Sequence, residues 1–320
     1  MNEIRRSKKL LKAAFTVLFR EKKLLLFPII GTGLALIVAL FYFAPITFYP
    51  TGHSYFSTAH WSAIGERISQ SFSLPPQHSA DHPVLTRVAT GLTGGSHVIF
   101  RHWWITLLFA SSYFTSMFLG TFCNVAFYHE IMQAINGNAV SIQRGFRFAA
   151  MRWRAVLLWS LFAGLIGYII RAIEQRVGIF GKLIAGLIGF TWSVASIFII
   201  PTLVHDTETI NPLQLLRHSA GTLKRTWAEL VIGFVGVEAI LIFYTMPIML
   251  AIFFISGFYH LAVSPVLILL CAMFLMIFPL SWICQVANSV YRCALYIYAT
   301  EGVVPGTFDK ELLDSAWKVK

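Results

Sequence analysis

Six long apolar stretches, each bounded by Lys, Arg or His, divide the chain. A bilayer core of about 30 Å is crossed by roughly 20 residues of α-helix, which is close to the length of each stretch. They run over residues 24–48, 104–128, 155–170, 183–204, 230–258 and 261–287. The pattern predicts an all-α integral membrane bundle of six transmembrane helices. Residues 1–320 form a single domain in this prediction, and residues 50–102 form an external loop subdomain within it.

A basic amphipathic segment precedes each span that is predicted to leave the cytoplasm. In the first segment, Leu11, Phe15 and Leu18 share one helical face, while Lys8 and Lys12 lie off it. Such a helix is expected to lie in the membrane interface on the cytoplasmic side. The recurrence indicates three units, each an interfacial helix followed by an outward and a return span. The alternative is the ordinary placement of basic residues before outward spans. The segments read RRSKKLLKAAFTVLFREKK, SIQRGFRFAAMRWR and NPLQLLRHSAGTLKRTW.

Composition and charge place most of the chain in lipid and orient it there. Hydrophobic residues make up 57% of the sequence and charged residues only 12%, about half the usual charged fraction. The net charge is +11, and the cations flank the apolar stretches, so membrane lipids of the anionic inner leaflet are the expected partner and nucleic acid is not. Nineteen of the 25 Lys and Arg fall in the two termini and the second and fourth loops. This bias predicts that both termini are cytoplasmic.

Short motifs spread over most of the chain, outside the first external loop, occur in a specific order. They are LLLFPII around Pro28, FCNVAF around Asn124, LLWSLFAGLIGYIIRAIEQR, TWSVASIFIIPTLVHD, SAGTLKRTWAE and LYIYATEGVVPGTFDKELLDSAW. In this order they resemble a family of bacterial polytopic membrane proteins known only as a domain of unknown function. The resemblance implies a multi-pass protein of the bacterial cytoplasmic membrane, and it supplies no catalytic residues.

Catalytic and metal-binding signatures are mostly missing. His129 and Glu130 open like a zinc-protease motif, but Gln133 stands where the second histidine is required. The histidines of the first external loop and its margin are irregularly spaced, so neither a metal site nor a cofactor is predicted. All four cysteines lie inside or at the end of apolar segments, which argues against a disulfide framework. The histidines in question are His53, His60, His78, His82, His97 and His102.

Glu238 is the most informative single residue, because it lies nine residues beyond Glu229 and therefore about 13 Å further along a helix into the membrane. A carboxyl group at that depth is expected to face the bundle interior. It marks either a proton or substrate path or a polar clamp between helices, and the clamp is favoured. Gln285 and Asn288 on the sixth span are its expected partners. Asn124 on the second span is the remaining intramembrane polar candidate.

Three classes of function stay open at this point. A non-enzymatic role in transport or envelope support is favoured, because intramembrane polar residues are few and no arrangement of acid, base and nucleophile is recognisable. An intramembrane enzyme acting on lipid is the alternative, with Glu238 and Asn124 as its polar centre. The third class is a scaffold for another membrane protein or for a second copy of the chain.

The clamp hypothesis for Glu238 predicts how two substitutions differ. Glu238→Gln keeps the size and hydrogen-bonding capacity of the side chain and is expected to be nearly silent. Glu238→Leu is expected to lower thermal stability in detergent by about 1 kcal/mol, the order of one interhelical hydrogen bond. A Glu238→Gln variant that folds normally but reproduces the phenotype of a gene deletion would favour the proton or substrate path instead.

Overall fold

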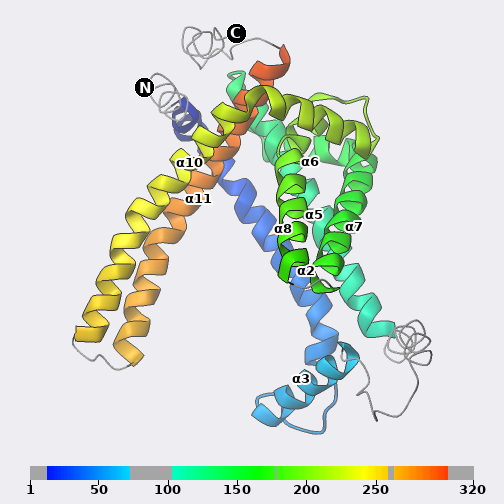
Figure 1. The fold of residues 1–320 in the computed structure, drawn as a ribbon, viewed down its shortest axis with the longest axis vertical. Helices are drawn as coiled ribbons and strands as arrows, with labels where there is room; N and C mark the ends of the chain where they lie inside the picture. Colours follow the sequence, from blue (N-terminus) through cyan, green and yellow to red (C-terminus); the bar gives the residue numbers. More distant parts are fainter. Residues whose placement is uncertain (1–12, 73–102, 177–178, 259–262, 302–320) are drawn as a thin grey trace. The chain divides into compact units, whose positions relative to one another are not determined.

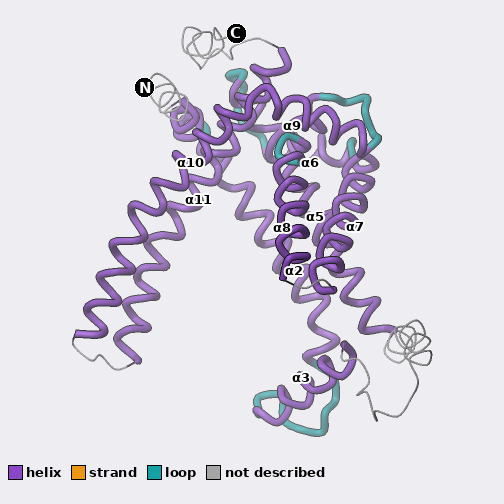
Figure 2. The backbone as a smooth tube through the Cα atoms, in the orientation of Figure 1, coloured by secondary structure: helices purple, strands orange, loops and turns teal. Residues whose placement is uncertain are grey.

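The computed structural model describes residues 13–72, 103–176, 179–258 and 263–301, and within these ranges every regular element is helical (Figure 1, Figure 2). The all-α prediction is therefore confirmed for this part of the chain. Residues 13–20 are helical. The elements that follow are the 3₁₀ helix η1 (Lys22–Leu25) and the α-helices α2 (Leu26–Thr47), α3 (Thr58–Phe72), α5 (Trp103–Ile135), α6 (Ile142–Met151), α7 (Trp153–Arg176), α8 (Ile179–Ala195), α9 (Ile199–His205), α10 (Pro212–Phe258) and α11 (Val263–Glu301).

Three helical segments are long and apolar enough to cross a membrane: Lys22–Thr47, Trp153–Glu174 and Leu183–His205. They coincide with the first, third and fourth predicted spans. The predicted second, fifth and sixth spans fall within the long helices α5, α10 and α11, and their membrane crossing stays a prediction. The turn predicted near His260 lies outside the described residues.

The chain divides into two compact units. The smaller unit, residues 32–120, contains the second half of α2 and the first half of α5, which contact each other through a hydrogen bond of 2.9 Å between the Tyr42 and Thr115 hydroxyls. Phe43 and Phe109 add an edge-to-face contact between the same two helices, with ring centroids 6.4 Å apart. The larger unit comprises residues 1–31 and 121–320.

Two helical hairpins form much of the larger unit. Helices α10 and α11 lie side by side (Figure 1), and α7 packs on α8, where the Trp159 and Trp192 rings stack 6.0 Å apart. Ser219 of α10 bridges the break between α8 and α9. Its hydroxyl accepts a hydrogen bond from the Phe198 amide and donates one to the Ala195 carbonyl. These bonds satisfy backbone groups that a helix end leaves unpaired.

A break in helical geometry lies near the end of each of the three amphipathic segments. Glu21 (φ −112°, ψ 68°) separates residues 13–20 from η1 and α2, and Arg152 (φ −97°, ψ 14°) separates α6 from α7. Thr226 (φ −118°, ψ 16°) interrupts α10 in the same way. The amphipathic part and the apolar part of each pair are thus consecutive helices that change direction at one residue.

Gly145 allows α6 to pack closely against α5. A Cβ atom at this buried position would lie 2.8 Å from the Ala126 carbonyl oxygen and 2.9 Å from Cγ of Glu130. Both distances are shorter than van der Waals contact, so any larger residue must push the two helices apart.

Gly145→Ala is therefore expected to destabilise the protein by about 1–3 kcal/mol, the usual cost of overpacking a well-packed site. Thermal unfolding in detergent measures the change. Gly221→Ala in α10 is the matched control, because a Cβ atom there meets nothing within 4 Å and alanine favours the helix. Equal stability of the two variants would contradict the close packing of α5 and α6.

Candidate functional site

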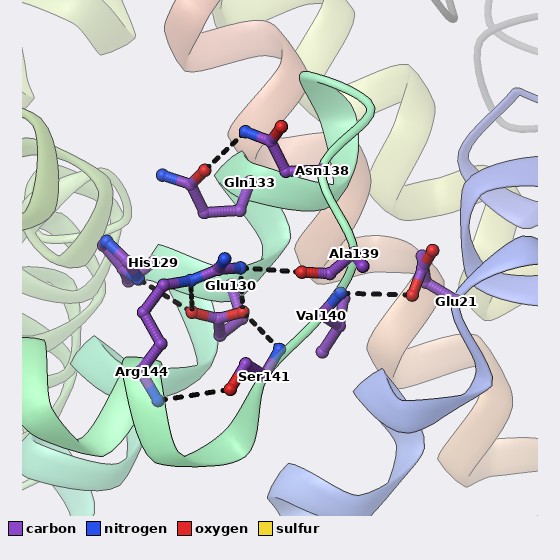
Figure 3. Close-up of polar contacts among 9 residues, drawn as sticks. All are labelled: Glu21, His129, Glu130, Gln133, Asn138, Ala139, Val140, Ser141 and Arg144. Atoms are coloured by element: carbon purple, nitrogen blue, oxygen red, sulfur yellow. Dashed lines mark hydrogen bonds and ion pairs between the residues drawn. The ribbon is translucent and has the colours of Figure 1, made fainter.

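A buried carboxylate occupies the corner where the chain turns from α5 into α6 (Figure 3). The turn follows Gly137, whose φ of +85° suits the left-handed conformation that commonly ends a helix. Ser141 then caps α6. Its side-chain hydroxyl accepts a hydrogen bond from the backbone amide of Arg144. Glu130, near the end of α5, is fully buried beneath this turn. We call Glu130, His129, Ser141 and Arg144 the first corner.

Both oxygens of Glu130 are occupied. Oε2 accepts from the Ser141 amide at 2.7 Å and from Nη2 of Arg144 at 2.6 Å. Oε1 accepts from Nε of Arg144 at 2.9 Å and from Nδ1 of His129 at 3.1 Å. A buried charge is tolerated only when it is paired and hydrogen-bonded in this way. Glu130 therefore ties the end of α5 to the start of α6.

The two side chains around Glu130 have complementary protonation states. Hydrogen bonding to Glu130 raises the pKa of Arg144, which also donates to the Ala139 carbonyl at 2.8 Å. Burial lowers the pKa of His129, and this outweighs the opposite effect of Glu130. Since a carboxylate can only accept, the neutral imidazole carries its proton on Nδ1. The His129 ring stacks on Phe148 with centroids 4.1 Å apart.

Hydrogen bonds join the helix break at Glu21 to the turn between α5 and α6. Nη2 of Arg20 donates to the Ala134 carbonyl at 2.5 Å, and Oε2 of Glu21 accepts from the Val140 amide at 3.2 Å. Figure 3 shows Glu21 reaching the turn from the opposite side to Arg144. The corner thus joins three helical segments that are far apart in sequence.

A second corner lies between α9 and α10 and depends on Arg152. The Arg152 guanidinium donates to the carbonyls of Asp206 at 2.8 Å and Thr209 at 3.1 Å, and it also bonds those of Leu203 and Thr207. Burial lowers the pKa of Arg152, and Asp206 partly offsets this. A cation at the end of α9 satisfies its last carbonyls and opposes its helix dipole.

The two corners share an order of residues. A His–acid pair precedes each corner: His129 and Glu130 stand in the last part of α5, and His205 and Asp206 stand at the end of α9. Asp206 accepts from the amide and hydroxyl of Thr209 at 3.1 and 2.6 Å. Although burial opposes the change, these hydrogen bonds lower the pKa of Asp206. Nδ1 of His218 in the following helix lies 3.7 Å from Asp206, the counterpart of the Arg144 contact.

Of the intramembrane polar candidates singled out from the sequence, the structure describes the side chains of Asn124, Gln285 and Asn288. Asn124 and Gln285 are exposed, whereas Asn288 is buried. Within the described part of the chain, no hydrogen bond joins the side chains of these three residues. The backbone of Glu238 lies in α10, but its side chain lies outside what the structure describes, so its role stays a prediction.

The zinc-binding spacing considered for His129 and Glu130 did not predict the first corner. The partners of Glu130 stand 11 and 14 residues further on, at Ser141 and Arg144. The available signal was a capping serine, four residues after the turn glycine Gly137 and followed three residues later by arginine. Among the described residues, no three His, Cys, Asp or Glu side chains are grouped as metal ligands would be. His53 and His60 are described, and the other loop histidines are not.

With every oxygen of Glu130 engaged, the first corner is built to hold helices together. The Glu130 carboxylate is therefore not a free base, and a metal ion bound to it would have to displace Arg144. The face of Arg144 turned away from Glu130 is the part of the corner open to a ligand, since its side chain is 41% exposed.

Comparison with known proteins identifies a family. The model described as "Family of unknown function (DUF6159)" matches residues 102–306. Searches of curated proteins and of solved structures gave no match to the chain.

Breaking the Glu130–Arg144 pair is expected to be costly. Arg144→Gln leaves a buried carboxylate without its cation and should lower the free energy of unfolding by about 3 kcal/mol, the lower end for such pairs because Arg144 is partly exposed. The double variant Glu130→Gln/Arg144→Gln should recover part of this loss. Glu301→Gln, which removes the exposed pair with His205, is the control and should cost at most about 1 kcal/mol. Additive losses in the double variant would show that the pair is not coupled.

Proposed function

The chain belongs to the family of unknown function DUF6159, whose model matches well over half of it, and on that basis we propose that it is a six-span protein of the bacterial cytoplasmic membrane with a non-enzymatic role in transport or envelope support. Both termini lie on the cytoplasmic side in this proposal. The residues that line any transport path are those of the spans, among which Glu238 is the first candidate.

The observation that carries the proposal is the outward placement of apolar side chains on the candidate spans. Leu40 and Phe41 of α2 are 63% and 71% exposed, and Leu183 and Phe190 of α8 are 65% and 62% exposed. In the first span, only 11% of the most apolar stretch of 18 residues is buried within the protein. Surfaces of this size and length are stable in lipid and not in water.

Exposed cations at the helix breaks support the orientation. Lys22 and Lys23 stand before α2, Arg154 stands at the start of α7, and Lys224 and Arg225 precede the break at Thr226. Each position is the point at which an amphipathic segment passes into an apolar helix. Cations there are retained on the cytoplasmic side and attract anionic headgroups.

The chemistry of the first corner supports a non-enzymatic role. Glu130 is the fully buried acid among the described residues, and its oxygens are used for helix contacts. An enzyme acting on lipid needs an acid, base or nucleophile that can reach its substrate. The favoured role is therefore one in which the bundle itself, and not a reacting side chain, performs the function.

One experiment in two parts tests this proposal. Reporter fusions at residues 80 and 320 are expected to lie on opposite sides of the membrane, because the six-span arrangement places residue 80 outside and residue 320 inside. Deletion of the gene is expected to alter solute uptake or envelope integrity while the lipid composition is unchanged. Reporters on one side would contradict the topology. Accumulation of one lipid, reversed by the wild type but not by Glu238→Gln or Asn124→Ala, would favour the enzyme.

A further inference from the structure

A buried histidine fixes the turn that follows α2. His60, at the start of α3, is fully buried. Its Nε2 lies 3.1 Å from the carbonyl of Thr47, the last residue of α2, and its Nδ1 lies 2.6 Å from the Thr51 hydroxyl. Because a carbonyl can only accept, Nε2 donates to Thr47, while Nδ1 pairs with the Thr51 hydroxyl. The segment between Thr47 and His60 is thus held at both ring nitrogens.

Aromatic side chains surround this histidine and yet remain exposed. The Tyr55 and Trp61 rings contact His60 edge to face with centroids 5.0 and 5.5 Å away, and Phe48 contacts Tyr55 at 6.0 Å. Phe48 is 69% exposed, and Phe56 is 100% exposed at the tip. We call Phe48, Tyr55, Phe56 and Trp61 the aromatic turn. Ring contacts with Tyr55 or His60 hold Phe48, Tyr55 and Trp61 in place, and Phe56 presents its whole apolar surface outward.

We propose that the aromatic turn is a lipid anchor, inserted into the interface of the leaflet at which α2 ends. This inference rests on the proposed function, because it requires α2 to cross the bilayer. The span from Lys22 to Thr47 has 26 residues, or about 39 Å of helix, which exceeds a hydrocarbon core of about 30 Å. Phe48 and the residues after it therefore begin at the headgroup level, where Trp and Tyr rings gather.

The charge pattern favours lipid over water or a polar partner. No Asp, Glu, Lys or Arg occurs between Lys23 and Glu66, so the uncharged stretch continues 18 residues past the end of α2. Two of the local hydroxyls also bond within the segment: Ser57 donates to the Ser54 carbonyl and Ser62 to the Ala59 carbonyl. A segment without Asp, Glu, Lys or Arg and with hydroxyls bonded in this way enters the interface at reduced desolvation cost.

Photocrosslinking of the full-length protein in cell membranes tests the anchor. Benzoylphenylalanine is introduced singly at position 56, at position 66 and at position 40, and adducts are identified by mass spectrometry. Leu40 reports on the span because it is 63% exposed in α2. Glu66 is the control for the polar side of α3, since it lies about 140° around the helix from Trp61. We expect phospholipid adducts at 56 in a yield comparable with that at 40, and none above background at 66.

The three positions separate the failure of the anchor from the failure of the proposed function. Lipid adducts at 40 with only water-quenched label at 56 would overturn the anchor and leave the spanning helix intact. Protein adducts at 56 in place of lipid would also overturn it, by identifying a protein-binding surface. Absence of lipid adducts at 40 would contradict the membrane span and, with it, both proposals.

Discussion

The fully buried carboxylate of Glu130 is the constraint on which the larger unit depends. Ser141 and Arg144 reach it from α6, and His129 reaches it from α5, while Arg20 and Glu21 bind the same turn from the N-terminal break. An isolated charge in this position would be strongly destabilising, so the contacts among these segments stabilise the fold. Gly145 makes the meeting possible, because a side chain there would occupy the space of Glu130 and the α5 backbone.

The second corner also satisfies a helix end with a charged side chain, but there the side chain is the cation Arg152 and not an acid. Arg152 binds the carbonyls at the end of α9 and beyond it, where the first corner uses an acid to bind an amide at the start of α6. In both corners a helix end is satisfied by a charged side chain from another segment. Both corners have a His–acid pair before the turn and a partner of the acid after it, Arg144 at the first and His218 at the second.

The aromatic turn, which follows the other end of α2, contains no Asp, Glu, Lys or Arg. A ring nitrogen of His60 satisfies the Thr47 carbonyl, so no Lys or Arg is needed at this end of the helix. The charged head of a Lys or Arg would stay in water, and without one the surrounding aromatic rings are able to enter the interface. The corners and the aromatic turn thus differ in how they satisfy helix ends, by Glu and Arg side chains in one case and by a histidine ring in the other.

The sequence alone determined that the chain is helical, where the first, third and fourth apolar helices run and which family it resembles. Apolar periodicity and segment length are local properties, and the helices that they predict are present in the structure as α2, α7 and the segment of α8 and α9. The polar contacts of Glu130 could not be predicted from such local properties. Asn124 and Glu130 stand six residues apart on one helix, yet one is exposed and the other fully buried. Only tertiary structure decided between them, because the burial of Glu130 depends on partners across a turn, and no local pattern encodes that distance.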